Sequence, residues 1–282
     1  MTIFTLRPEF SPKSFSSKHA GYLKLLRERL ERLILHPGPD EIHYLRIAIR
    51  RYRIVSEMLP KSLRKGEEVM KYISACRELL RATSRVRDMD IINECLAGYA
   101  DSDALTELRR IATGWRSAGM PRVRECALAL LHTDCPRISS RQINRKELNR
   151  RIGKVLERTA SACDDGLRTV ARDAGNTEAL HSLRKNLRRV RYVLELFPGK
   201  RRLKETLKKL TEWHRVLGSI RDVDITLDYL EKEKAAQSQN IIRGKTLKDR
   251  RLKHAAFLKL MREDNVIDDV LSGLIASQRE VR

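Results

Sequence analysis

The sequence is poor in the residues that build disulfide, metal and catalytic sites. Aromatic residues make up 5% of the chain, and the five cysteines are odd in number and contain no CxxC pair, which indicates neither a disulfide framework nor a zinc module. A Walker loop, an HExxH sequence and a nucleophile elbow are also missing. These absences favour a binding protein without a cofactor or metal over an enzyme.

Long apolar runs are missing as well. No segment approaches the roughly 20 apolar residues that a membrane-spanning helix needs. The first ten residues, MTIFTLRPEF, lack the basic and apolar regions of a secretory signal. We therefore expect no membrane partner and a cytoplasmic location.

Positive charge is what the sequence has in excess. Lys and Arg number 59 against 37 Asp and Glu, which gives the 282 residues a net charge of +22. Such an excess predicts attraction to polyanions rather than a particular fold. Leu, Ala, Arg, Lys and Glu dominate the rest, and these helix formers predict an all-α protein.

Helical periodicity covers most of the chain. Helices are expected at 13–35, 39–60, 61–83, 88–100, 102–118, 121–132, 141–172, 177–197, 200–217, 222–236 and 239–277. Pro39 suits a first helical turn, since its missing N–H would be unpaired there, and Asp40 and Glu41 complement the positive helix end. The segment HTDCPRISS, residues 132–140, has the turn-rich composition of a boundary.

One cationic segment occurs twice. HYLRIAIRRYRIVSEMLP (43–60) and HSLRKNLRRVRYVLELFP (181–198) align without gaps. Helix packing repeats apolar positions, but it does not require arginines at the same four places. The matched cationic and histidine positions are His43/His181, Arg46/Arg184, Arg50/Arg188, Arg51/Arg189 and Arg53/Arg191.

A shorter segment is repeated downstream of each copy. SRVRDMDI (84–91) and GSIRDVDI (218–225) share an RDxD sequence that begins at Arg87 and Arg221. We expect the first aspartate of each to cap a helix and the second to complement the helix dipole. Both repeats together predict a duplication, with domains at 12–133 and 138–277, each of about four helices and related by an approximate twofold axis.

The cations of each copy share one side of a helix. At about 100° per residue, the histidine and three arginines fall within a stripe of about 80°. The stripes consist of His43, Arg46, Arg50 and Arg53, and of His181, Arg184, Arg188 and Arg191. Successive arginines are about one turn, roughly 5.4 Å, apart, and each can fork two donors onto phosphate oxygens. A solvated charged face is the alternative, against which we expect the stripes to lack acidic partners one turn away.

The pattern HxxRxxxRRxR followed by RDxD, present twice in a basic helical chain, resembles the CHAD domain, the conserved histidine α-helical domain, over about residues 12–277. The resemblance implies an all-α fold of two four-helix-bundle-like repeats around a basic central cavity that binds inorganic polyphosphate. The expected binding residues are His43, Arg46, Arg50, Arg51, Arg53, Arg87, His181, Arg184, Lys185, Arg188, Arg189, Arg191 and Arg221. Lys185 stands opposite Ile47 in the other copy, which leaves the equivalence of the half-sites open.

Other polyanion partners are also compatible with the charge. Nucleic acid is the main alternative, although aromatic residues for stacking are scarce and no known reader motif is present. Docking of acidic proteins needs only the charge, and an accessory role beside a polyphosphate- or triphosphate-metabolising enzyme is a further alternative. The histidines have an equal claim to be packed or capping residues. Polyphosphate binding predicts association with polyphosphate granules, for storage, targeting or regulation.

Overall fold

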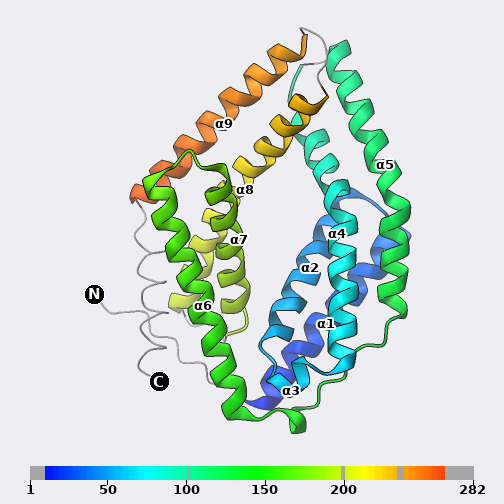
Figure 1. Cartoon of the computed structure of the whole chain (residues 1–282), viewed down its shortest axis with the longest axis vertical. Coiled ribbons are helices and arrows are strands. Elements are labelled where there is room, and N and C mark those ends of the chain that lie inside the picture. Colours follow the sequence, from blue (N-terminus) through cyan, green and yellow to red (C-terminus); the bar gives the residue numbers. More distant parts are fainter. Residues whose placement is uncertain (1–9, 101, 198–200, 234–237, 264–282) are drawn as a thin grey trace.

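The computed structural model describes residues 10–100, 102–197, 201–233 and 238–263, and all regular structure in them is helical (Figure 1). The elements are α1 (Pro12–Leu35), α2 (Pro39–Glu57), α3 (Lys61–Arg64), α4 (Glu67–Leu96), α5 (Asp103–His132), the 3-10 turn η1 (Ser140–Gln142), α6 (Arg145–Arg172), α7 (Thr177–Leu194), α8 (Arg201–Lys232) and α9 (Ser238–Glu263). The all-α prediction is confirmed. The domain limits and the twofold relation stay predictions, and residues 264–277 of the second predicted domain lie outside the described residues.

The predicted starts at 39 and 177 agree with the structure, and the start predicted at 141 lies at Arg145 instead. Pro39 opens α2, and both acidic residues that follow it lie in the first turn. Asn144 and Asn176 precede α6 and α7, and their side chains accept hydrogen bonds from the backbone N–H groups of Glu147 and Ala179, as helix N-caps do.

Three predicted helix breaks are wrong. α4 runs through residues 84–87 and α8 through residues 218–221, because buried residues such as Val86 and Ile220 continue the apolar face of each helix. α5 runs through Pro121. Proline removes the hydrogen bond to the carbonyl four residues earlier, and that carbonyl belongs to Ser117, which is exposed and can be solvated.

The RDxD aspartates are consequently not helix caps. Asp88 and Asp90 lie inside α4, and Asp222 and Asp224 lie inside α8. Both segments lack a glycine or proline pair that would force a turn, and tertiary packing keeps them helical. The predicted capping role is therefore wrong for all four residues.

Apolar contacts join the first four long helices to the last four. The largest core contains buried residues of both sets, and Phe10 packs on Phe197 while its N–H donates to Asn149. A smaller core connects α4 and α5 with α8 and α9, where the Tyr229 hydroxyl donates to the Leu108 carbonyl at 2.7 Å. Between these contacts, α2 lies next to α7 and α4 next to α8, in the middle of the molecule (Figure 1).

Candidate functional site

The two duplicated stripes lie on neighbouring helices, one on α2 and one on α7, and they face each other. Packing explains this orientation, because the opposite sides of both helices are buried, for example at Leu45 and Ile49 in α2 and at Leu183 and Leu187 in α7. The arginines are therefore directed into the space between the helices.

Four arginines form a central arginine cluster in this space: Arg46, Arg50, Arg184 and Arg188. Burial lowers the pKa of all four, to about 10 for Arg46 and Arg50 and to about 9 for Arg188, and neighbouring guanidiniums act in the same direction. The charge of Arg50 in α2 lowers the pKa of Arg188 in α7, and the charge of Arg184 in α7 lowers the pKa of Arg50. The cluster thus holds half-buried like charges that an anion would stabilise.

A cavity of about 990 Å³ adjoins the central arginine cluster. Its walls come from α2, α4, α6, α7 and the chain around α3. Nine of the lining residues are cationic: Arg50, Arg53, Arg64, Lys65, Arg77, Arg158, Lys185, Arg188 and Arg189. Glu57 is the single carboxylate among its lining residues. The cavity therefore has the charge of an anion-binding site.

Five of the thirteen predicted binding residues line this cavity, namely Arg50, Arg53, Lys185, Arg188 and Arg189. Arg51 and Arg191 instead pair with Glu195, at 3.0 and 3.4 Å. The expectation that the stripes lack acidic partners one turn away is therefore wrong at Arg191, whose partner is four residues further along α7.

Arg46 and Arg184 occupy matching places in the two stripes but have different surroundings. Arg46 Nη1 donates to the Leu80 carbonyl at 2.8 Å and to Thr83 Oγ1 at 2.7 Å. Arg184 lies over Gly218, where an added Cβ would be 3.5 Å from its guanidinium, and Arg184 Nε has no hydrogen-bond partner among the described residues. Only Arg46 is tied to a neighbouring helix in this way.

The first aspartate of each RDxD sequence faces arginines of both halves. Burial raises the pKa of Asp88, while Arg46 and Arg221 lower it; burial likewise raises the pKa of Asp222, while Arg184 and Arg87 lower it. Arg87 of α4 thus lowers the pKa of Asp222 in α8, and Arg221 of α8 lowers the pKa of Asp88 in α4. These charges connect the two halves beside the central arginine cluster.

The second aspartate of each RDxD sequence has a structural role that the sequence analysis missed. Asp90 accepts a hydrogen bond from Arg116 Nε at 2.6 Å, and Asp224 accepts one from Arg250 Nε at 2.6 Å. Both contacts hold an outer helix, α5 or α9, against an inner one. The signal was present in the sequence, since each arginine follows its aspartate by 26 residues.

Three histidines lie near the arginines. The side chain of His43 is exposed at the surface. Partial desolvation by its neighbours and then the charge of Arg87 lower its pKa. Burial and then Arg221 lower the pKa of His181 to about 4, and its Nδ1 is buried without a hydrogen-bond partner among the described residues. His214 of α8 was not predicted; burial and then Arg184 lower its pKa to about 2. The repeats gave no signal for it, because Leu80 occupies the matching position.

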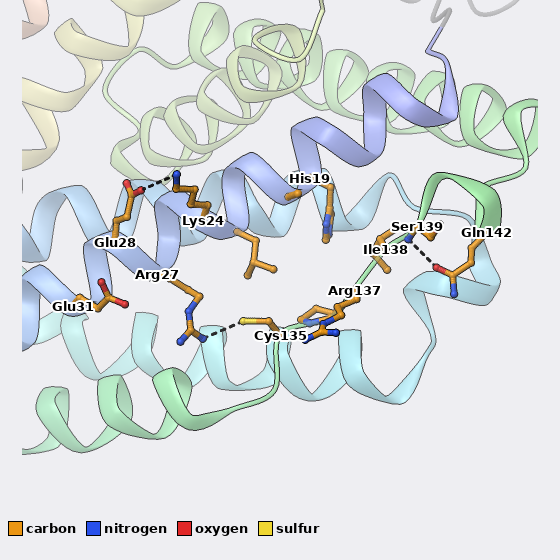
Figure 2. Close-up of a pocket in the computed structure, with 13 residues that line it drawn as sticks. His19, Lys24, Arg27, Glu28, Glu31, Cys135, Arg137, Ile138, Ser139 and Gln142 are labelled. Atoms are coloured by element: carbon orange, nitrogen blue, oxygen red, sulfur yellow. Dashed lines mark hydrogen bonds and ion pairs between the residues drawn. The ribbon is translucent and has the colours of Figure 1, made fainter.

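A second pocket, of about 840 Å³, lies between α1 and residues 135–142 (Figure 2). Arg27 points toward Cys135 and donates to its sulfur at 3.1 Å, while Lys24 lies 4.0 Å from Glu28. The lining also contains Glu31, so its cations are offset by carboxylates. This pocket does not have the charge of an anion site.

In the part of the chain that the structure describes, no group of three or more His, Cys, Asp or Glu residues could hold a metal ion. None of the described helices is both long enough and apolar enough to cross a membrane.

Comparison with known proteins identifies one family, and the similar solved structures include the following two. The CHAD domain profile matches residues 19–231 and 154–265. The fold is similar to the crystal structure of the CHAD domain from the plant Ricinus communis, with a TM-score of 0.63, 17% identity, and coverage of 98% of this chain and 95% of that one. It is also similar to PptA from Streptomyces chartreusis, with a TM-score of 0.52, 14% identity, and coverage of 90% and 99%. No curated protein sequence matches significantly.

Proposed function

The chain belongs to the CHAD domain family, and from this premise we propose that it binds inorganic polyphosphate in the cavity beside the central arginine cluster. One observation carries the proposal: nine cationic side chains and a single carboxylate line this cavity. A linear polyanion matches such a wall better than a single phosphate, because successive charges can meet successive guanidiniums.

Polyphosphate also relieves the unfavourable charge of the free protein. The central arginine cluster places half-buried like charges together, and a bound anion stabilises their ionised forms. An anion would likewise raise the pKa of His181, which burial and its cationic neighbours lower in the free protein. Binding is therefore expected to recruit protons as well as phosphates.

Binding without hydrolysis is the activity we propose. Phosphoanhydride cleavage usually needs a metal or a positioned general base. The one carboxylate of the cavity, Glu57, is engaged by arginines. We further propose a cytoplasmic protein that associates with polyphosphate granules.

Calorimetric titration with anions of increasing length tests the proposal. Long-chain polyphosphate should bind at least about 100-fold more tightly than orthophosphate, and its affinity should fall linearly with salt on logarithmic axes as counterions are released. RNA and DNA of the same total charge serve as competitors. Equal affinity for orthophosphate and long chains, or preferential retention of nucleic acid, contradicts the proposal.

A further inference from the structure

The cavity extends beyond the duplicated stripes to a second group of arginines. Arg64 at the end of α3, Arg151 and Arg158 of α6, and Arg189 of α7 form this outer arginine cluster around Glu57. Their mutual influence is direct, because the charges of Arg64, Arg158 and Arg189 all lower the pKa of Arg151 after burial does. Three of these cations lie within ion-pair distance of one carboxylate, and the fourth, Arg64, acts on Arg151.

Glu57 uses both of its carboxylate oxygens within the outer arginine cluster. Arg158 Nη2 donates to Oε1, and Arg189 Nη2 donates to Oε2. Arg151 Nη2 lies 3.8 Å from Oε1, and Arg151 Nε donates to the Glu57 backbone carbonyl at 3.0 Å. Arginines of two helices thus converge on a single anionic group.

The outer arginine cluster has more donors than the protein satisfies. Arg64 Nε and Arg189 Nε are buried and have no hydrogen-bond partner among the described residues. The side chain of Arg158 is 59% exposed and that of Arg189 is 35% exposed, whereas Glu57 is 23% exposed. A ligand from solvent can therefore reach the same guanidiniums that Glu57 contacts.

We propose that Glu57 is a placeholder for a phosphate unit in a second anion subsite, which a polyphosphate chain occupies by displacing the carboxylate from the outer arginine cluster. This inference rests on the proposed function for the identity of the ligand. An internal phosphate unit of the chain carries two non-bridging oxygens and one negative charge, which a carboxylate reproduces. The arginines exchange one anionic partner for another, so the displacement leaves none of their charges uncompensated, and its cost is the loss of the ion pairs of Glu57.

The subsite makes the protein sensitive to chain length. Arg50 and Arg188 line the cavity together with Arg64 and Arg158, so one chain can meet both clusters only when it spans the cavity. A short chain held at the central arginine cluster leaves Glu57 in place. A longer chain gains the outer contacts and pays the cost of displacing Glu57.

Two variants of equal charge separate this subsite from general electrostatics. Glu57→Gln and Glu195→Gln each remove one carboxylate that pairs with arginines, but Glu195 does not line the cavity. With long-chain polyphosphate, Glu57→Gln should increase the affinity about tenfold, the effect of removing a competing ion pair. Glu195→Gln should change it less than about twofold, since only diffuse charge is altered.

Arg158→Ala tests the subsite from the opposite side. It should lower the affinity for long chains several-fold and leave tripolyphosphate binding unchanged, and circular dichroism should confirm that the exposed substitution preserves the fold. Equal gains for the two glutamine variants, a loss of affinity in Glu57→Gln, or an unchanged Arg158→Ala overturns the placeholder while polyphosphate binding stands. Absence of binding in every variant overturns the proposed function and this inference together.

Discussion

The two copies of the cationic helix differ in the contacts that one pair of matched arginines makes. Arg46 and Arg184 match in the duplication, yet Arg46 donates to Leu80 and Thr83 of α4, whereas Arg184 Nε has no hydrogen-bond partner among the described residues. The first arginine is fixed by hydrogen bonds to α4, whereas the second interacts with Asp222 of α8 through charge and keeps an unused Nε donor. A repeated residue therefore identifies a location rather than a common role.

Other repeated residues keep one role in both copies. Asp90 and Asp224 each accept a hydrogen bond from an arginine of the adjacent outer helix at 2.6 Å. Glu57 and Glu195 occupy matching positions and both bind arginines, but only Glu57 lines the cavity. The helix-to-helix anchors are alike, while the residues that face the cavity have diverged.

Removing two arginines from either copy gives the largest expected effect. Arg184→Ala with Arg188→Ala should lower polyphosphate affinity by about 100-fold, because two half-buried guanidinium forks are lost. Arg46→Ala with Arg50→Ala should cost somewhat less, since part of the donor capacity of Arg46 is already used within the protein. Calorimetry measures both, and circular dichroism checks that helical content is retained.

The control for this comparison is Arg109→Ala with Arg110→Ala on the exposed side of α5, which removes the same two charges. Screening should limit its effect to a few-fold change at physiological salt. If all three double variants lose affinity equally, the cavity is not the binding site and the protein is a general polyanion binder.

The free energy of unfolding should depend more on Arg46 than on Arg184, which is the reverse of the order expected for affinity. Arg46→Ala should lower the free energy of unfolding by about 1–2 kcal/mol, because charged hydrogen bonds to Leu80 and Thr83 are lost. Arg184→Ala should lower it less, because the lost attraction to Asp222 is partly offset by the removal of repulsion from neighbouring arginines. Urea unfolding of the free variants measures both, and equal destabilisation would show that the attraction between Arg184 and Asp222 contributes as much as the hydrogen bonds of Arg46.

The sequence predicted the features that follow helical periodicity. The starts of α2 and α7, their buried sides and the arginine stripe on each helix all depend on residues close together in the chain, such as Leu45 and Arg46. The breaks predicted near Val86 and Pro121 failed because local composition was weighed without the tertiary packing that keeps α4 and α5 continuous.

The outer part of the cavity could not be predicted from the repeats. Arg64, Arg158 and Glu57 come from three different helices and meet only in the folded protein. His214 matches a leucine in the first half, Leu80, so a comparison of the two repeats could not identify it. Unmatched residues are where the two halves acquire different chemistry.

The pH dependence of stability should come from histidines of both halves, because burial lowers the pKa of His19 in α1, as well as that of His181 in α7, to about 4. Burial lowers the pKa of His181 from its ordinary value of 6.5 to about 4, so below pH 6.5 the unfolded chain binds the proton first. Its stabilising contribution is complete above pH 6.5 and is lost as the pH falls toward 4, by at most about 1.4 kcal/mol per pH unit. Urea unfolding between pH 7 and 5 should show this loss, and saturating polyphosphate should reduce it.

Histidine variants locate that effect. His181→Gln should flatten the pH dependence of the free protein more than His43→Gln does, because His43 is exposed. Identical profiles for the two variants would assign the proton linkage elsewhere, for example to His214.

Gly218→Ala should have the smallest effect and sharpens the comparison of Arg46 with Arg184. The new Cβ would lie 3.5 Å from the Arg184 guanidinium, which is an ordinary contact, so the arginine need not move. Alanine is favoured over glycine inside a helix by about 0.5–1 kcal/mol, and urea unfolding should show a gain of that size with polyphosphate affinity changed less than about twofold. Gly218→Leu, whose side chain cannot share this space with Arg184, should instead weaken binding. If both substitutions leave affinity unchanged, Arg184 does not contribute to polyphosphate binding from its place over α8.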